Sequence, residues 1–321
     1  MKSMSAIVGI AVFLTGCNSN PTLDEVHESA LLENQTISVL GEERDFHLYL
    51  PDSPVSAPIV LLLHGNGGSS DQLLGLNGTN APYKVWFDIA RQENIVLVVP
   101  NGTLGSDGRR GWNDCRNDAR TNPDTDDVRY IGDLINFVRS TYGSSASTVY
   151  ALGTSNGGHM SMRLAAELPD MIQAIAFIVA SKPVNSECAE PAIPTSVLVM
   201  NGTDDPIAPY NGGQIASNRG EVYSTAETVE YWKNRNQTDA APIVVEIPNS
   251  DSDDNSTVRR FSYVNGTGDS VVEHYEVVNG GHTEPSMVER YGNLFKLIVG
   301  NQNGDMEMAT EIWEFFKSQQ R

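Results

Sequence analysis

Positive charge and metal-binding side chains are both scarce in this sequence of 321 residues. Lysine and arginine together number 21 against 41 aspartates and glutamates, which leaves a formal net charge of −20 at pH 7. This charge argues against nucleic acid and against anionic membrane surfaces as electrostatic partners, because both attract basic proteins. The three cysteines and six histidines do not cluster at the spacing of metal ligands. We therefore expect no structural zinc, and the serine chemistry considered below needs no cofactor.

Apolar runs long enough to span a membrane are also missing. The apolar run nearest the N-terminus is separate from those of the folded domain. Lys2 precedes an apolar stretch over 6–14 that is too short to span a bilayer permanently and is typical of a secretory signal. The following Leu14-Thr15-Gly16-Cys17 resembles the lipobox of bacterial lipoproteins. The resemblance implies a signal peptide over 1–16 and attachment of lipid to Cys17, which would anchor the chain to a membrane.

The residues after the lipobox extend this interpretation. Asn18 is not the aspartate that retains lipoproteins in the inner membrane, so the resemblance implies an exported protein at the outer membrane or cell surface. An ordinary cleaved signal with an incidental cysteine is the alternative. We expect residues 17–34 to form a polar tether and residues 35–321 to form one folded domain, because no change in composition marks a second one.

Short apolar runs recur along this domain and predict the strands of a buried sheet. They cover residues 58–63, 95–99, 174–179 and 196–200. Alternating or later strands are expected over 36–40, 44–50, 242–248, 257–264 and 271–278, and helices over 127–142 and 310–319. Strands that alternate with helices indicate an α/β protein with a mostly parallel sheet and helices on both faces.

One stretch combines these signals with a chemical motif. An apolar run over 147–152 is followed by Gly153-Thr154-Ser155-Asn156-Gly157 and then by a helical pattern over 160–168. A Gly-x-Ser-x-Gly turn between a strand and a helix is typical of a nucleophile elbow, in which flanking glycines allow a strained, exposed serine. The alternative is a glycine-rich turn in which Ser155 only caps the helix.

A nucleophilic serine needs a base, and the base needs an acidic partner that orients it. His282 follows the last predicted strand after two glycines, which favours it as the base. His159, one turn into the helix, is better explained by packing or by support of a catalytic residue, and His274, inside a strand, by packing. The acid is either Asp204 or Asp205, in the loop after the strand over 196–200.

Backbone donors for a developing oxyanion are expected at two places. The loop His64-Gly65-Asn66-Gly67-Gly68 follows the first central strand, and we expect the amide of Asn66 to act together with the amide of Asn156. Cys115 and Cys188 both lie in loops after predicted strands. They form either a disulfide, as exported proteins permit, or two free thiols.

Several motifs together resemble the secreted polyhydroxybutyrate depolymerase and feruloyl esterase family of α/β-hydrolases. They are His64-Gly65-Asn66-Gly67-Gly68, Gly111-Trp112-Asn113-Asp114, Asp126-Asp127-Val128, the Ser155 pentapeptide with Gly158, the loop over 202–210, and Gly280-Gly281-His282-Thr283. The resemblance covers about residues 40–320 and implies a catalytic domain of the α/β-hydrolase fold. It also implies that Asp205 is the catalytic acid and that Trp112 borders the substrate; the alternative for Trp112 is an anchor of a surface loop.

The resemblance implies a serine esterase that acts through an acyl-enzyme on ester substrates. Only a short loop containing Cys188 stands where many relatives carry a cap domain, so we expect an open cleft and bulky or polymeric esters, either polyhydroxyalkanoates or feruloyl or acetyl groups on polysaccharides. Glu284 stands where many relatives have tryptophan, which argues against an aromatic acyl preference. The alternatives are a broad carboxylesterase for small esters and a non-catalytic lipoprotein that binds polymer or glycan.

Overall fold

A computed structural model describes residues 29–144 and 148–320 of the chain. The expected signal peptide and Cys17 lie outside these residues. Among the helices of the described part, none combines the length and the apolar character that crossing a bilayer requires.

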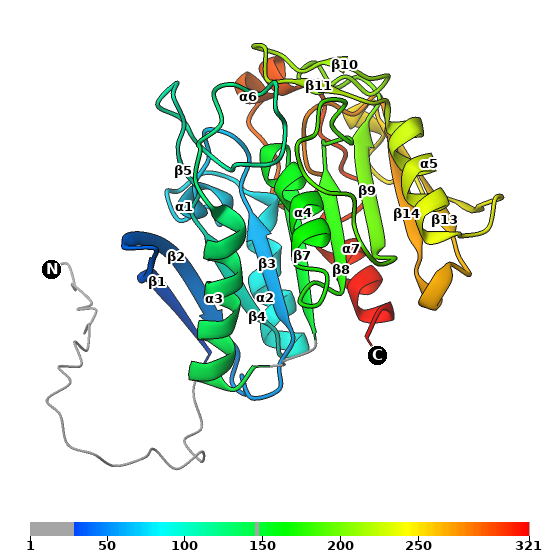
Figure 1. Ribbon diagram of the computed structural model, residues 1–321. Coiled ribbons are helices and arrows are strands. Elements are labelled where there is room, and N and C mark those ends of the chain that lie inside the picture. The colour runs from blue at the N-terminus through cyan, green and yellow to red at the C-terminus, as the bar shows by residue number, and fades with distance from the viewer. Residues whose placement is uncertain (1–28, 145–147, 321) are drawn as a thin grey trace, which may run out of the picture.

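The domain is built on one sheet of ten strands, in the order β1-β2-β4-β3-β7-β8-β9-β14-β13-β12 (Figure 1). The six central strands are parallel: β4 (Val96–Pro100), β3 (Ile59–Leu63), β7 (Val149–Thr154), β8 (Ala174–Ile178), β9 (Ser196–Gly202) and β14 (Val272–Val278). The flanking strands are antiparallel: β1 (Ala30–Val39) and β2 (Glu42–Leu50) on one side, β13 (Thr257–Tyr263) and β12 (Ile243–Glu246) on the other.

Helices cover both faces of this sheet. They are α1 (Ser70–Leu73), α2 (Val85–Glu93), α3 (Asp127–Tyr142), α4 (Asn156–Glu167), α5 (Thr225–Asn236), α6 (Asn293–Val299) and α7 (Met308–Ser318). Single 3-10 turns occur at Pro82–Lys84, Ser252–Asp254 and Thr267–Asp269. Two small hairpins, β5 (Thr103–Leu104) with β6 (Arg110–Gly111) and β10 (Gly213–Gln214) with β11 (Glu221–Val222), stand apart from the sheet.

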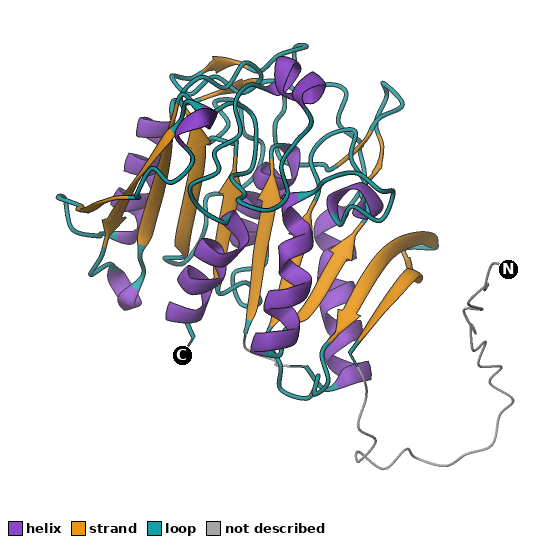
Figure 2. Cartoon of the chain, turned by 180° about the vertical axis from the view of Figure 1, so that it is seen from behind, coloured by secondary structure: helices purple, strands orange, loops and turns teal. Residues whose placement is uncertain are grey.

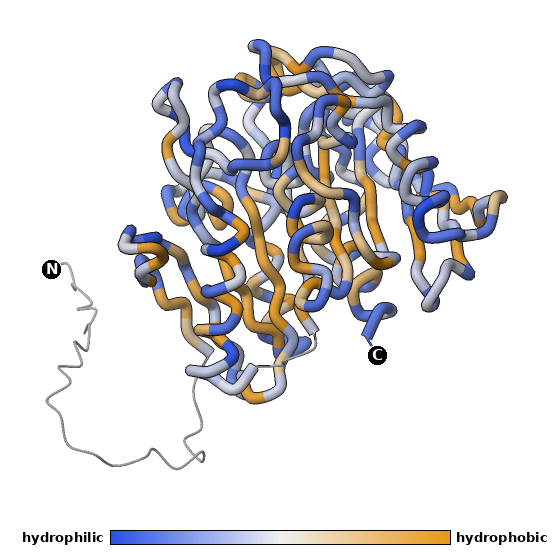
Figure 3. The backbone as a smooth tube through the Cα atoms, viewed as in Figure 1, coloured by the Kyte–Doolittle hydropathy of each residue, from blue (hydrophilic) through white to orange (hydrophobic). Residues whose placement is uncertain are grey.

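The alternation of side chains along a strand explains the two layers. In β3, Leu61 packs into the core beneath α3, α4 and α5, whereas its neighbour Leu62 packs into the core beneath α2 and α7. A strand buried on both faces must be apolar throughout, and the central strands are accordingly the most hydrophobic part of the chain (Figure 3).

The predicted architecture is confirmed: a mostly parallel sheet of the α/β-hydrolase type with helices on both faces, and no cap domain over the described residues. Helix α3 has the predicted bounds, while α4 begins at Asn156, four residues earlier than the periodicity indicated. The expected tether over 17–34 is wrong at its end, because Ala30 already pairs with Leu50 in the sheet. Leu31 and Leu32 pack against the cores there, so the folded domain includes residues before 35.

The parallel strands determine where side chains from distant parts of the chain meet. Their carboxyl ends lie at one edge of the sheet, and the loops that follow them gather there together with α6, β10 and β11 (Figures 1 and 2). In open α/β sheets this edge is where ligands bind.

Candidate active site

Ser155 occupies a sharp turn between β7 and α4. Its backbone angles are φ 53° and ψ −119°, a conformation that costs free energy for a residue with a side chain. The flanking glycines are required, because a Cβ atom on Gly153 would overlap the carbonyl group of Gly157, and one on Gly157 would overlap the carbonyl group of Leu63. The serine is thereby held at the N-terminus of α4, where backbone N–H groups lack partners within the helix.

His282 and Asp205 meet across the loops that follow β14 and β9. The Nδ1 atom of His282 lies 2.7 Å from Oδ2 of Asp205, whose side chain is buried. Oδ1 of Asp205 accepts hydrogen bonds from the amides of Ile207 and Ala208 at 2.7 and 2.8 Å, so the carboxylate is fixed in place. The neighbouring Asp204 is exposed, and among the described residues its carboxylate accepts a hydrogen bond only from Thr203.

Ser155 and His282 line the same cleft, which has a volume of about 690 Å³. Within the described chain no hydrogen bond joins the hydroxyl of Ser155 to the imidazole of His282. Such bonds are often long without substrate and tighten when it binds. Because Nδ1 faces Asp205, Nε2 is the imidazole nitrogen that remains for proton transfer in the cleft.

The loop after β3 lies directly against the serine. A Cβ atom on Gly65 would stand 3.4 Å from Cβ of Ser155, so Asn66 follows at the edge of the reaction centre. Within the described part of the chain, the backbone amides of Asn66 and Asn156 donate to no protein acceptor. Two unpartnered N–H groups next to a strained serine are the arrangement that an oxyanion requires.

The side chain of Asn156 has a separate, structural role. Its Oδ1 accepts a hydrogen bond from the amide of Trp112 at 2.7 Å, and its Nδ2 donates to the Trp112 carbonyl and to Asp114. Burial raises the pKa of Asp114, but the charge of Arg116 and further hydrogen bonds outweigh this, so its pKa is lowered and the carboxylate stays ionised. The start of α4 is therefore tied to the loop after β6.

The expectation that Trp112 borders the substrate is wrong. The indole is fully buried and is not part of the cleft wall among the described residues. Its ring lies 4.9 Å from that of His64, and its Nε1 donates to the His64 carbonyl. The physical reason is that a large apolar ring next to two strand ends gains more from burial behind the loop than from exposure in front of it.

The two remaining cysteines are joined. A disulfide links Cys115, after β6, with Cys188, in the loop between β8 and β9, and their Cα atoms are 5.3 Å apart. Together with Glu167 these cysteines form the only grouping of metal-ligand side chains found among the described residues. The disulfide occupies both sulfur atoms, so the group lacks the thiolates that would bind a metal.

The other two downstream histidines are packing residues, as expected. Nε2 of His159 lies 3.0 Å from the carbonyl oxygen of Ser181, and burial lowers the pKa of this imidazole to about 3. His274 lies in β14 between the rings of Tyr210 and Phe261, and burial lowers its pKa to about 4.

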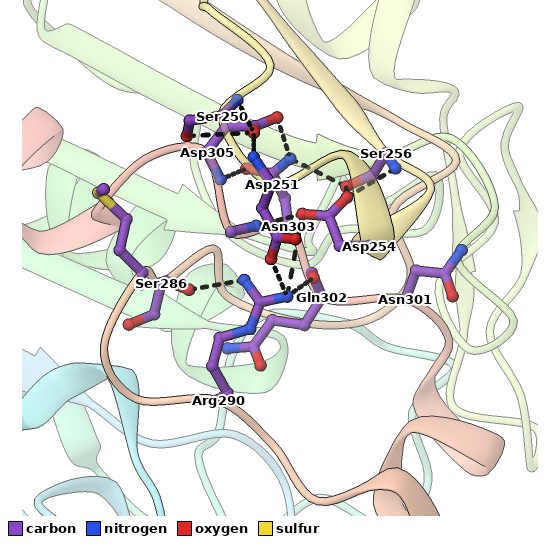
Figure 4. Close-up of polar contacts among 12 residues, drawn as sticks. Ser250, Asp251, Asp254, Ser256, Ser286, Arg290, Asn301, Gln302, Asn303 and Asp305 are labelled. Atoms are coloured by element: carbon purple, nitrogen blue, oxygen red, sulfur yellow. Dashed lines mark hydrogen bonds and ion pairs between the residues drawn. The ribbon is translucent and has the colours of Figure 1, made fainter.

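The acidic loop over 250–256, which could resemble a calcium loop, is satisfied by protein groups (Figure 4). Asp305 accepts from the amides of Ser250 and Asp251, and the guanidinium of Arg290 lies 3.2 Å from Asp251. Arg290 also donates to the Ser286 carbonyl, so this network braces the segment that follows His282.

Sequence reasoning named Glu284 only for its effect on acyl preference, and it missed two arginines of the cleft. Glu284 accepts a hydrogen bond from Tyr291 at 2.6 Å, and Arg109 and Arg219 line the same cleft from the two small hairpins. The position of Glu284 relative to His282 was the only available signal. The two arginines lie in irregular turns, where no periodic pattern marks a position as facing the cleft.

A sheet of this topology with a serine elbow and an aspartate–histidine pair over its carboxyl edge defines a hydrolase of the α/β class. Residues 37–284 match the model of the family described as "Putative esterase", and the chain belongs to this family. It is thus a carboxylic ester hydrolase.

Known proteins are similar over most of the domain. "Putative esterase NocK" of Nocardia uniformis is 28% identical over 263 residues, covering 78% of this chain and 73% of the relative. "Probable feruloyl esterase C" of Aspergillus flavus is 28% identical over 209 residues, covering 64% of this chain and 67% of the relative. The solved acetyl xylan esterase from Aspergillus awamori shares the fold, with a TM-score of 0.52 at 16% identity, over 84% of this chain and 98% of that one.

Proposed function

We propose that Ser155, His282 and Asp205 are the catalytic triad of this esterase. The observation that carries the proposal is the 2.7 Å contact between His282 and Asp205 at the wall of the cleft into which Ser155 projects. This contact orients the imidazole and places a negative charge where an imidazolium forms. It also supports Asp205 over Asp204, whose carboxylate contacts no histidine of the described chain.

In this mechanism the Ser155 oxygen attacks the ester carbonyl while Nε2 of His282 takes the hydroxyl proton. The tetrahedral oxyanion accepts hydrogen bonds from the amides of Asn66 and Asn156. His282 returns the proton to the departing alcohol, which leaves an acyl-enzyme. A water molecule, deprotonated by His282, then attacks the acyl carbon and releases the acid, and Ser155 regains its proton. The reaction requires no cofactor.

Bulky or polymeric esters are the proposed substrates. The cleft is open, and its rim is continuous with α6, whose Leu294, Leu297 and Ile298 are exposed. Contiguous exposed apolar residues are uncommon in a monomeric protein unless they bind something. The names of the feruloyl and acetyl xylan esterases among the similar proteins support acyl groups on polysaccharide, and the apolar rim supports a polyhydroxyalkanoate.

We further propose that the protein acts outside the cytoplasm as a lipoprotein anchored through Cys17. The basis is the signal and lipobox sequence at 1–17. The disulfide between Cys115 and Cys188 supports this location, because disulfides persist in oxidising compartments and are rare in the cytosol. Mass spectrometry of the mature protein from membranes would detect the lipidated Cys17, and an unmodified N-terminus before residue 17 would contradict the proposal.

The triad is tested by labelling with a fluorophosphonate probe, which reacts only with an activated serine. The full domain should be labelled, Ser155→Ala should not, and Ser140→Ala, which changes an exposed serine on α3, should be labelled like the parent. Labelling that survives in Ser155→Ala would disprove the assignment. An unlabelled parent would instead favour a protein that only binds polymer or glycan.

Substrate class is tested with a panel of esters that vary in acyl length and aromaticity, together with a polyhydroxybutyrate film and feruloylated or acetylated xylan. A preference for the small soluble esters alone would indicate a broad carboxylesterase.

A further inference from the structure

Two arginines face the cleft that contains Ser155 and His282. Arg109 lies in the turn between β5 and β6, and Arg219 lies in the turn that leads into β11. Both turns stand at the loop end of the molecule, above the carboxyl edge of the sheet (Figure 1). Two hairpins outside the main sheet thus each contribute a guanidinium to one wall of the cleft.

Both arginine side chains lie next to the loop that carries Asn66. The side-chain oxygen of Asn66, in the amide orientation that satisfies both of its ends, accepts hydrogen bonds from the two terminal nitrogens of Arg219 at 3.1 and 3.2 Å. The Cδ atom of Arg109 stands 3.9 Å from the position that a Cβ on Gly67 would occupy. Both arginines are thus neighbours of the loop that is proposed to supply one oxyanion donor.

Neither of these arginines is neutralised. In the described part of the chain no carboxylate lies within 4.0 Å of either guanidinium, although most other described arginines have such a partner. Asp107, on the same turn as Arg109, accepts a hydrogen bond from the Arg109 amide, and its charge acts on Arg219. A chain of net charge −20 thus leaves two cations unpaired at its reaction cleft.

The like charges also affect each other. Burial lowers the pKa of the Arg219 guanidinium, and the nearby charge of Arg109 lowers it further, with Asp107 acting in the opposite direction. Arginine nevertheless stays protonated in proteins. Two adjacent cations repel each other, and an anion bound between them removes that cost and can accept a paired set of N–H donors.

A negatively charged side chain, Glu284, lies elsewhere in the cleft. Glu284 is held by Tyr291 through a hydrogen bond of 2.6 Å, beside the segment of His282 and α6. The carboxylate of Glu284 does not approach within 4.0 Å of Arg109 or Arg219, so it does not occupy their donors. The cleft therefore has a cationic side at the two hairpins and an anionic side at Glu284.

We propose that Arg109 and Arg219 form a subsite that binds a carboxylate group of the ester substrate, next to the scissile bond. This inference rests on the proposed function, because it assigns a substrate class to the same cleft. A carboxylate can come from a uronic acid on the polysaccharide that carries the acyl group, or from the free acid end of a polyhydroxyalkanoate. The shared chemistry is an anion with two oxygens that matches the fork of a guanidinium.

Binding is measured by calorimetry on Ser155→Ala, so that no probe is hydrolysed. Two anionic probes, a xylo-oligosaccharide with one glucuronic acid and a 3-hydroxybutyrate oligomer with a free acid, are compared with neutral counterparts, the unsubstituted xylo-oligosaccharide and the oligomer methyl ester. We expect one anionic probe to bind about tenfold or more tightly than its neutral counterpart. The preference should weaken as salt is added, because the subsite is open to solvent.

The arginines are then changed one at a time and together. Arg109→Gln and Arg219→Gln should each remove most of the preference, Arg109→Lys should retain part of it, and Arg91→Gln should retain all of it, since Arg91 pairs with Asp88 on α2. A preference that is absent for both anionic probes, or that persists in the double glutamine variant, overturns the subsite. Fluorophosphonate labelling of the chain with Ser155 intact reports on the esterase separately, so the two failures are distinguishable.

Discussion

The indole Nε1 of Trp112 donates a hydrogen bond to the carbonyl oxygen of His64 at 2.8 Å. The two residues are 48 positions apart and follow different strands, β6 and β3. Both side chains are buried, and the bond holds the loop with Asn66 from the side opposite the cleft. The position of one proposed oxyanion donor thus depends on a side chain that no substrate touches.

Trp112→Phe should therefore destabilise the protein beyond the effect of the smaller ring. A buried carbonyl that loses its partner costs about 1–3 kcal/mol in the free energy of unfolding. Trp86→Phe is the matched control, because Trp86 is equally buried and its Nε1 has no hydrogen-bond partner in the part of the chain that the structure describes. Urea unfolding gives the loss in free energy of unfolding for each variant. The difference between the two losses is the contribution of the hydrogen bond from Trp112 to His64. Equal losses would show that it contributes nothing to stability.

The sequence was sufficient to predict the elements that carry strong local patterns. The apolar run of β3 and the periodicity of α3 identify buried surfaces through their own residues alone. The Ser155 turn was predictable for the same reason, since its glycines are required by contacts within and next to the turn.

Features that depend on contacts between distant segments were not predictable in this way. The burial of Trp112 depends on His64, and the turns of Arg109 and Arg219 converge only because two hairpins fold over the same loop. Helix α6 shows an apolar run without a buried face, which sequence reasoning did not interpret. The start of β1 at Ala30 depends on its pairing with β2.

Asp205→Asn should lower kcat by about 10³–10⁴-fold with little effect on KM, because the amide neither fixes the Nδ1–H tautomer of His282 nor stabilises its cation. Asp204→Asn changes the same kind of side chain one position earlier and should leave kcat within about twofold of the parent, a small barrier difference. Steady-state kinetics on a 4-nitrophenyl ester decide between the two. A larger loss in Asp204→Asn would reverse the assignment of the acid.

Removal of the Cys115–Cys188 disulfide should destabilise the fold by about 2–4 kcal/mol, since it closes a long loop in the unfolded chain. The bonded residues are 73 positions apart. The double variant Cys115→Ala with Cys188→Ala should unfold at lower urea than the parent and should no longer respond to dithiothreitol. If dithiothreitol leaves the parent unchanged under conditions that reduce the bond, the disulfide does not stabilise the fold.

Stability should decrease as the pH falls from about 6.5 to about 4, because buried histidines cannot take up protons in the fold. Burial lowers the pKa of His64 to about 4, of His159 to about 3 and of His274 to about 4. Between these values and the ordinary 6.5 the unfolded chain binds more protons, so the free energy of unfolding rises with pH.

The contribution of a single histidine to the pH dependence of stability can be measured at His274, which lies away from the cleft. Each such histidine contributes at most about 1.4 kcal/mol per pH unit in this window. His274→Gln removes one titrating group, so the difference in unfolding free energy between pH 7 and pH 5 should be smaller than in the parent. An unchanged difference would mean that His274 takes up its proton as readily in the fold as in the unfolded chain.

Helix α6 should determine activity on an insoluble polymer more than activity on a soluble ester. Leu294 and Leu297 are 79% and 83% exposed, and the same helix contributes Phe295 and Ile298 to the cleft. If the helix lies on the polymer, Leu294→Ser with Leu297→Ser should lower product release from a polyhydroxybutyrate film by about tenfold, since each leucine loses apolar contact. The ratio of film activity to 4-nitrophenyl acetate activity is the quantity to compare. Ile243→Ser with Val244→Ser, on the exposed edge strand β12, should leave this ratio unchanged, and an equal fall in both double variants would contradict a docking role for α6.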